Sequence, residues 1–345
     1  MRRHVTVLGG GAMGTALAHA IASADRDCVL WSREVELVRG VNENRRNPRH
    51  FTDLVLGPSL SATTSLKQAM RSAQLAIVVV RSDAVRELAR EIGAFVPPDL
   101  VLLSATKGLE PETNKRLSEI LEEETGARVV GAISGPNSMQ DIIAGRPTAL
   151  VVASIANLAL PIAAEAITLP TLRVFGSSDL VGVELAAALK NVVAIAVGIA
   201  AGLDLGDNAR AFLIAIGLAE IQKLAVSLGA CTSTFMGLAG FGDLFLTTTS
   251  PHSRNHWVGV ELGRGASLSE LLAHLERTSE TAEGVNSIRA CRELAARQRL
   301  HMPLAECVYA VAYESAEPRR AFERLMSDST VAASLAASDF CGLRE

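Results

Sequence analysis

The first 175 residues contain seven short apolar runs that alternate with stretches of helical periodicity. These runs are "HVTVL" at 4–8, "CVLW" at 28–31, "LAIVVV" at 75–80, "LVLLS" at 100–104, "VVGAI" at 129–133, "ALVVA" at 149–153 and "LRVF" at 172–175. Near-continuous apolar strands separated by helices are typical of a largely parallel sheet that is buried on both faces. The pattern therefore predicts a doubly wound α/β fold for the first half.

The second half shows helical periodicity without strand signals. Apolar residues of one segment recur at intervals of four, three, four and three positions, namely Ile214, Leu218, Ile221, Ala225 and Leu228. This spacing predicts a helix whose other side carries Glu220. Asp207 or Asn208 can cap that helix, and Gly229 can end it. We therefore expect an all-α second half.

The length of 345 residues predicts two domains, which we place at 1–180 and 181–345. A net charge of −4 and the lack of a lysine or arginine run argue against a nucleic-acid binder. The densest basic stretch, "NENRRNPRH" at 42–50, is interpreted as a solvated loop. The N-terminal apolar run is too short for a signal sequence, and the longest apolar stretches fall short of a membrane span. We expect a soluble protein.

The cysteines indicate a reducing compartment. They are odd in number, scattered and never spaced as CxxC, at positions Cys28, Cys231, Cys291, Cys307 and Cys341. Neither a disulfide framework nor a zinc site is expected from such a pattern, and the cytoplasm is the expected location.

A glycine-rich loop follows the first predicted strand. "TVLGGGAMGTALA" at 6–18 places Gly9, Gly11 and Gly14 in G-x-G-x-x-G spacing at the start of a predicted helix. In a dinucleotide site the first glycine permits the turn, the second admits the pyrophosphate and the third allows close helix packing. The strand, helix and following strand that this motif requires are all predicted, which favours dinucleotide binding over a purely structural turn.

The end of the second predicted strand bears on the choice between NAD and NADP. An NAD site usually has an acidic residue there, but "WSRE" places Ser32 and Arg33 at that point. Arg33 can pair with a 2′-phosphate and favours NADP, whereas Glu34 can still meet a ribose hydroxyl and keeps NAD possible. A surface helix start is the alternative without a binding role.

A lysine interrupts the apolar run "ALKNVVAIAVGIAAG" at 188–202. Lys190 has no acidic neighbour within helical reach, so it either extends its ammonium to the surface or faces a cleft. In a cleft, loss of water and a nearby cation such as Lys107 would ease proton release at neutral pH. The adjacent polar Asn191 favours the cleft.

The segment "GLAGFGDLFLTTTSPHSRN" at 237–255 is rich in turn formers and in donors to anions. Its arginine, amide and hydroxyl groups predict an anion-binding loop. The alternative is a turn between helices in which Asp243 and Ser253 act as caps. His252 and His256 lack a third metal ligand at a recognisable spacing and are interpreted as surface histidines.

Taken together, the chain resembles the soluble NAD(P)-dependent glycerol-3-phosphate dehydrogenases over nearly its whole length. The matching pieces, in the same order, are "GGGAMGTALA" at 9–18, "NPRHF" at 47–51, "SATKGLE" at 104–110, "SGP" at 134–136, "ALKNV" at 188–192, "GDNARA" at 206–211, "GLAE" at 217–220, "GFGDLFLT" at 240–247, "SRN" at 253–255 and "EG" at 283–284. The resemblance implies a Rossmann-like domain, a helical substrate domain and a homodimer. It also implies reversible reduction of dihydroxyacetone phosphate to sn-glycerol 3-phosphate for phospholipid synthesis, without a metal.

The same resemblance assigns residue roles. Lys190 becomes the general acid for the ketone oxygen, with Lys107 and Asp243 beside it as catalytic residues. The implied substrate-binding residues are Lys107, Gly135, Asn137, Asn191, Thr247, Ser253, Arg254 and Asn255. The implied cofactor-binding residues are Gly9, Gly11, Ala12, Met13, Gly14, Arg33, Lys107, Met139, Arg254 and Glu283.

Three departures from the family pattern keep other functions open. Asn137–Met139 replaces a Thr/Ser-Phe-Ala sequence, Ala12–Met13 replaces Ser-Trp or Ser-Tyr, and an arginine often found near Ile216 is absent. One alternative is a relative that reduces another phosphorylated or phosphonylated ketone. Another is a dinucleotide-binding sensor without catalysis, since nucleotide folds are reused in that way.

Overall fold

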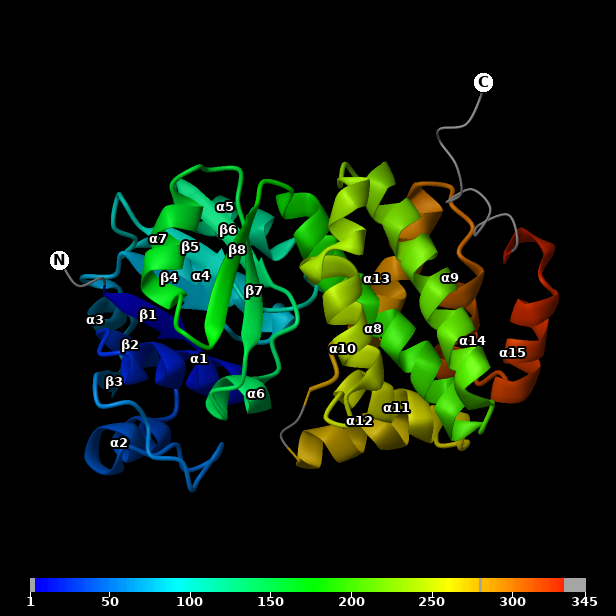
Figure 1. Ribbon diagram of the computed structural model, residues 1–345, viewed down its shortest axis with the longest axis horizontal. Coiled ribbons are helices and arrows are strands. Elements are labelled where there is room, and N and C mark those ends of the chain that lie inside the picture. Colours follow the sequence, from blue (N-terminus) through cyan, green and yellow to red (C-terminus); the bar gives the residue numbers. More distant parts are fainter. Residues whose placement is uncertain (1–3, 279–280, 332–345) are drawn as a thin grey trace. The chain divides into compact units, whose positions relative to one another are not determined.

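The computed structural model describes residues 4–278 and 281–331 (Figure 1). The chain divides into two compact units. Unit 1 comprises Met1–Glu110 and Lys115–Glu184, and unit 2 comprises Pro111–Asn114 and Leu185–Glu345.

Unit 1 is built on an eight-stranded sheet of order β3-β2-β1-β4-β5-β6-β7-β8. Its strands are β1 (Val5–Leu8), β2 (Cys28–Trp31), β3 (Leu60–Thr63), β4 (Leu75–Val78), β5 (Val101–Ser104), β6 (Val129–Ser134), β7 (Thr148–Ala153) and β8 (Leu172–Ser177). All neighbouring pairs are parallel except β6 and β7. The predicted doubly wound, largely parallel sheet is confirmed. Strand β3 is not among the predicted strands, because "LSAT" is short and half polar.

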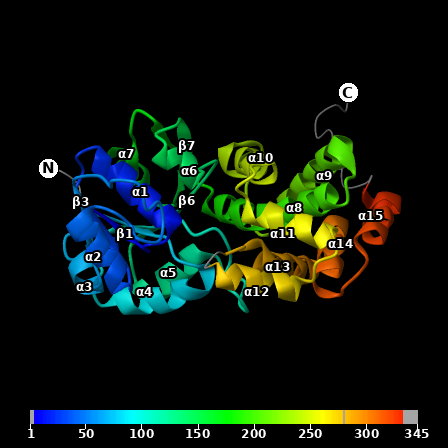
Figure 2. The same ribbon diagram turned by 90° about the horizontal axis from the view of Figure 1, so that it is seen from below.

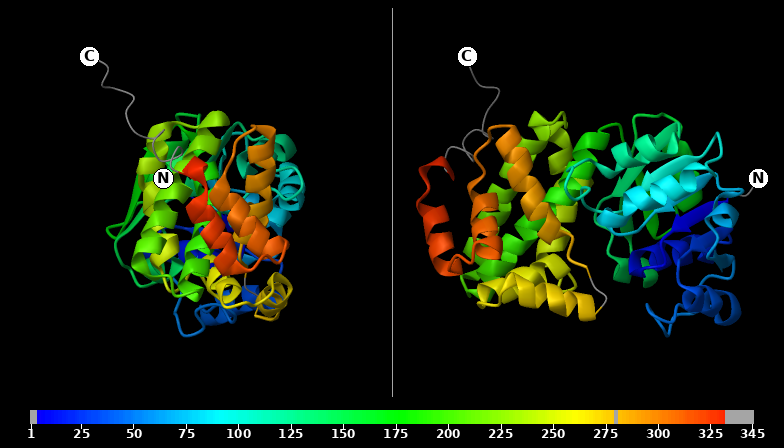
Figure 3. Two further views of the ribbon diagram at one scale, coloured as in Figure 1. Left: turned by 90° about the vertical axis from the view of Figure 1, so that its right-hand side faces the viewer. Right: turned by 180° about the vertical axis from the view of Figure 1, so that it is seen from behind.

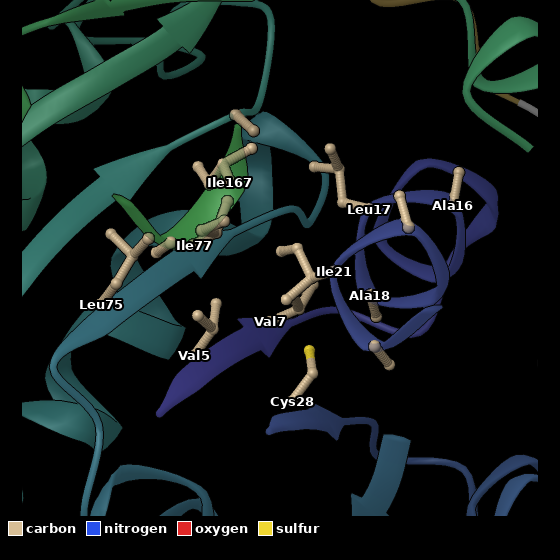
Figure 4. Close-up of a cluster of buried hydrophobic side chains, with 14 of the residues drawn as sticks. Val5, Val7, Ala16, Leu17, Ala18, Ile21, Cys28, Leu75, Ile77 and Ile167 are labelled. Atoms are coloured by element: carbon tan, nitrogen blue, oxygen red, sulfur yellow. The ribbon is translucent and has the colours of Figure 1, made fainter. Parts of the chain in front are cut away.

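Helices cover both faces of this sheet. They are α1 (Ala12–Ser23), α2 (Val35–Asn44), α3 (Leu66–Met70), η1 (Ser82–Ala84), α4 (Val85–Gly93), α5 (Leu117–Thr125), α6 (Met139–Ile143) and α7 (Ala159–Ile167). Val5 and Val7 of β1 point into the cluster under α1 and α7 (Figure 4), whereas Leu8 joins the cluster under α3, α4 and α5. Alternate residues of one strand thus fill opposite cores, which explains why the strands are continuously apolar.

In the part of the chain that the structure describes, unit 2 contains helices joined by turns and no strand. Its elements are α8 (Leu180–Gly202), α9 (Gly206–Ser227), η2 (Thr232–Met236), η3 (Leu238–Gly242), α10 (Asp243–Thr249), α11 (Arg254–Gly263), α12 (Leu268–Arg277), α13 (Gly284–Arg297), α14 (Pro303–Tyr313) and α15 (Pro318–Ser327). Helix α14 packs between α13 and α15 (Figure 3). The all-α second half is confirmed, and the first turns of α8 still belong to unit 1.

The predicted face of α9 is partly wrong. Ile214 and Leu218 are only half-buried, whereas Glu220 is 3% exposed. The Glu220 carboxylate accepts hydrogen bonds from the backbone N–H groups of Leu304 (2.7 Å) and Ala305 (3.2 Å) in the first turn of α14. Burial raises the pKa of Glu220 to about 7. A buried carboxylate that caps another helix cannot be distinguished by periodicity from one that faces water.

The ends of α9 were predicted with mixed success. The helix begins at Gly206 after Leu205 and has no side-chain cap, so the assignment of Asp207 or Asn208 as its cap is wrong. Gly229 follows the last turn with φ of +98°, a conformation that glycine adopts without strain. The predicted helix end is therefore confirmed.

Helices α8 and α11 touch backbone to backbone (Figure 2). A Cβ on Gly198 would lie 2.2 Å from the carbonyl oxygen of His256, and a Cβ on Gly259 would lie 2.1 Å from that of Ile195. Gly202 and Gly263 are equally confined one turn further along. Only glycine permits this approach between two helices.

Among the residues that the structure describes, α8 is the one helix with the length and mean hydropathy of a membrane-spanning segment. The expectation that no apolar stretch reaches that length is therefore wrong for α8. Most of the helix, 94% of its most apolar window, is buried inside the protein, as in a core helix. No disulfide joins any two of the described cysteines, Cys28, Cys231, Cys291 and Cys307, and Cys341 lies outside the described residues.

Candidate active site

The glycine loop of unit 1 joins β1 to α1. Gly9 has φ of +134°, and its N–H donates to the carbonyl oxygen of Trp31 (3.0 Å). A Cβ on Gly9 would lie 2.2 Å from the carbonyl oxygen of Val79, and one on Gly14 would lie 2.0 Å from that of Gly9. The first and third glycines are therefore required by the fold itself.

Gly11 is different, because a Cβ there would meet no protein atom within 4 Å. The residue precedes the first turn of α1, and no side chain caps that helix. The N–H groups of the first turn are then available to an anion, and the missing side chain leaves room for a pyrophosphate. This arrangement fits the dinucleotide that the motif predicts.

Asn47 supports this loop from outside the motif. Its side-chain amide donates to the carbonyl oxygen of Gly10 (3.2 Å) and to Oγ1 of Thr15 (2.8 Å), and the residue is fully buried. The interpretation of 42–50 as a solvated loop is therefore wrong in part, since its first residues end α2 and Asn47 is a core residue. The matching "NPRHF" motif was the only sequence signal for this role.

The two residues that bear on cofactor choice are both paired. The Arg33 guanidinium lies 3.3 Å from carboxylate oxygens of Glu87 and Glu91 on α4. Glu34 lies 2.8 Å from Nε of Arg49. These pairs are largely exposed, so each contributes little to stability, and a bound phosphate or ribose can replace them.

A second group of predicted residues meets around Lys107 in unit 1. The Lys107 ammonium donates to Oδ1 of Asn137 (2.6 Å) and to the carbonyl oxygen of Gly135 (3.3 Å). Asn137 is buried, and Gly135 directly follows β6 with φ of +102°. Asn137, one of the residues that differ from the family pattern, thus contacts Lys107 directly.

In unit 2, Lys190 is buried, with 3% of its surface exposed. Its ammonium forms an ion pair with the Asp243 carboxylate and donates to Oγ1 of Thr247 (2.7 Å). The Thr247 hydroxyl in turn donates to the carbonyl oxygen of Asp243 (2.7 Å), which leaves its lone pairs facing the ammonium. A buried, paired ammonium excludes the alternative in which Lys190 extends to the surface.

The segment 237–255 is more regular than its composition suggests. It forms η3, α10 and the start of α11, so the prediction of a loop is wrong. Asp243 is the first residue of α10 and Gly242 stands at its N-cap, whereas Ser253 does cap α11 by accepting from the His256 N–H (3.2 Å). The buried Asp243 side chain is used instead as the counter-ion of Lys190.

The predicted phosphate residues lie at the start of α11. Arg254 is exposed on its first turn, and Oδ1 of Asn255 accepts from the Gly284 N–H (2.9 Å) at the start of α13. Glu283 directly precedes that helix and is half-buried. Asn255 therefore joins the starts of two helices, beside the exposed guanidinium of Arg254.

The remaining predicted residues lie beside these groups. Asn191 is buried next to Lys190, and Ala12 opens α1. Met13 and Met139 pack against the same core cluster of unit 1. Within the described ranges, no group of three or more His, Cys, Asp or Glu residues could hold a metal ion.

Comparisons with known proteins agree with these motifs. The family model described as "NAD-dependent glycerol-3-phosphate dehydrogenase N-terminus" matches residues 4–159, and its C-terminal counterpart matches residues 179–323. The chain is 41% identical to a glycerol-3-phosphate dehydrogenase (NAD(P)+) of Streptomyces avermitilis, over 94% of this chain and 96% of the relative. It is 37% identical to one of Salinibacter ruber, over 95% and 96%.

A solved structure leads to the same family. The glycerol-3-phosphate dehydrogenase of Coxiella burnetii superimposes with a TM-score of 0.88 at 32% identity, covering 95% of this chain and 99% of the other. Similarity thus extends over both units. The chain belongs to the NAD-dependent glycerol-3-phosphate dehydrogenase family, whose members use NAD or NADP.

Proposed function

We propose that this protein reduces dihydroxyacetone phosphate to sn-glycerol 3-phosphate, reversibly and with a nicotinamide cofactor. The family membership and the open space at Gly11 support this activity. The buried, hydrogen-bonded ammonium of Lys190 carries the proposal, because a ketone that accepts a hydride also needs a proton on its oxygen. A bound dinucleotide supplies the hydride.

In this proposal Lys190 donates its proton to the ketone oxygen and takes it back in the reverse direction. Asp243 compensates the charge of the ammonium inside the protein, and Thr247 orients it. Lys107, held by Asn137, contributes a second positive charge that stabilises the developing alkoxide.

Arg254 and Asn255 hold the substrate phosphate in this proposal. The guanidinium offers a two-pronged contact, and the start of α11 favours a negative charge. A phosphate held away from the reacting carbon supplies binding energy that orients the ketone. Asn191, Ser253 and Gly135 complete the proposed substrate contacts.

For the cofactor, Ala12, Met13, Met139 and Glu283 extend the site formed by the three glycines. Arg33 favours the 2′-phosphate of NADPH, but its two carboxylate partners oppose a further negative charge. We therefore expect the protein to accept both cofactors. The resemblance further suggests a cytoplasmic homodimer that supplies phospholipid synthesis.

A turnover assay tests the proposal. Loss of the reduced nicotinamide absorbance is followed with NADPH and NADH, using dihydroxyacetone phosphate and a panel of other phosphorylated and phosphonylated ketones. We expect the highest kcat/KM with dihydroxyacetone phosphate. Turnover of only another ketone would support the specialised relative that the Asn137–Met139 change suggests, and cofactor binding without turnover would support a sensor.

A further inference from the structure

One buried carboxylate has no part in the proposed chemistry. Glu184 is 7% exposed, and burial raises its pKa. Its two oxygens accept hydrogen bonds from the Ser118 N–H (2.9 Å), from the Ser118 hydroxyl (2.6 Å) and from the Arg116 guanidinium (3.0 Å). Three donors around one carboxylate indicate a fixed attachment rather than an accidental contact.

The attachment joins α8 to the loop that carries Lys107. Ser118 lies in the first turn of α5, and Arg116 immediately precedes that helix. Arg116 also forms a β-bridge with Leu109, two residues after Lys107. Glu184 therefore holds the beginning of α8 against the base of this loop, within unit 1.

Helix α8 then continues without a break into unit 2, where it carries Lys190. Lys190 lies six positions after Glu184, which corresponds to about 9 Å along a helix axis. A continuous helix transmits a displacement of its first turns to the residues that follow. We propose that Glu184 is a positioning residue, which sets the position of Lys190 by fixing the start of α8 to unit 1.

This inference rests on the proposed role of Lys190, so the test combines both residues. Variants Glu184→Ala, Lys190→Ala and the double variant are compared in the same turnover assay. A misplaced proton donor reduces kcat, and we expect Glu184→Ala to lower it by roughly 10- to 100-fold. The KM for NADPH should stay within about twofold, because the glycine loop is unchanged.

The double variant separates positioning from general damage. If Glu184 acts through Lys190, its removal should cost less than about threefold once Lys190 is absent, since the effects of coupled residues do not add. An equal loss in both backgrounds would overturn the inference. A normal rate for Lys190→Ala would instead contradict the proposed role of Lys190, and a wild type without turnover would contradict the proposed function, so the failures are distinguishable.

Glu220 provides a matched control. It is another buried carboxylate that accepts hydrogen bonds from main-chain N–H groups at a helix start, but it lies on α9 and contacts α14. Glu220→Ala should lower the melting temperature while changing kcat by less than about threefold. A loss of kcat equal to that of Glu184→Ala, at the same loss of melting temperature, would contradict a positioning role. If Glu184→Ala does not fold, Glu184→Gln keeps the side-chain volume and is tested in the same cycle.

Discussion

The glycine loop and the surroundings of Lys190 are built in different ways. The loop is complete within six residues. A Cβ on Gly9 or Gly14 would collide with the main chain, whereas Gly11 borders open space. Lys190 receives its partners from α10, with Thr247 lying 57 residues further along the chain. The first region is a local motif, whereas the second exists only once the helices of unit 2 pack. Substitutions in the glycine loop should therefore weaken cofactor binding, and substitutions around Lys190 should lower kcat.

The largest expected effect is that of Lys190→Ala. Loss of the proton donor should lower kcat on the order of 10³-fold, while the affinity for NADPH stays unchanged because the glycine loop is intact. Stopped-flow turnover and fluorescence titration of the cofactor measure the two quantities. A variant that turns over like the wild type would remove Lys190 from the mechanism.

This substitution needs a control, because it leaves the Asp243 carboxylate buried without its counter-ion. The double variant Lys190→Met, Asp243→Asn removes both charges and should recover thermal stability. We expect it to remain as inactive as the single variant. Recovery of activity together with stability would mean that unfolding caused the loss.

Sequence reasoning identified the local features and missed those formed by packing. Seven of the eight strands and the glycine motif were predicted, because each depends on a few consecutive residues. The apolar face of α9 was mistaken, because Glu220 caps a helix that lies over 80 residues away in sequence. The resemblance named Asp243 as a partner of Lys190, but composition alone suggested a helix cap. The structural roles of Asn47 and Glu184 were not predicted, since nothing in their local sequence shows that they are buried.

The second prediction concerns Glu220, a buried carboxylate of unit 2 that main-chain N–H groups stabilise, whereas Asp243 is paired with the Lys190 ammonium. Its pKa of about 7 lies above the ordinary value of 4.5, so the native state binds this proton more tightly than the unfolded chain does. The resulting stabilisation is complete below pH 4.5 and is lost as the pH rises through about 7. We expect this loss to reach about 3 kcal/mol at most.

Denaturant unfolding of the wild type and of Glu220→Gln at several pH values checks this expectation. The amide of the variant does not titrate, so its unfolding free energy should fall less between about pH 5 and pH 8 than that of the wild type. The two proteins share all other titrating groups, so the contributions of those groups cancel when one unfolding free energy is subtracted from the other. Parallel pH curves would show that Glu220 titrates normally.

The third prediction concerns the different roles of two glycines in the loop. Gly11→Ala meets no protein atom and should leave the melting temperature unchanged, but its methyl group enters the space assigned to the pyrophosphate. We expect both NADPH and NADH to bind about tenfold more weakly. Gly14→Ala would instead collide with the carbonyl oxygen of Gly9 and should lower the melting temperature. Equal effects of the two variants on stability would contradict this division.

The smallest expected effect is on cofactor preference. Replacing Glu87 and Glu91 by Gln removes the two carboxylates that hold Arg33, so the KM for NADPH should fall about two- to fivefold relative to that for NADH. High salt should reduce the difference. Glu36→Gln breaks a similar exposed pair with Arg39 on α2 and should leave the ratio unchanged.

The four glycines between α8 and α11 have a consequence for substrate selection. Contacts between backbones involve no rotamers, so the separation of the two helices does not vary as side chains move. In the proposed function, α8 carries the proton donor and α11 begins with the phosphate ligand Arg254. The main chain then fixes the separation of the two helices from which these side chains project, and replacing one of the glycines is a direct way to change the length of molecule accepted.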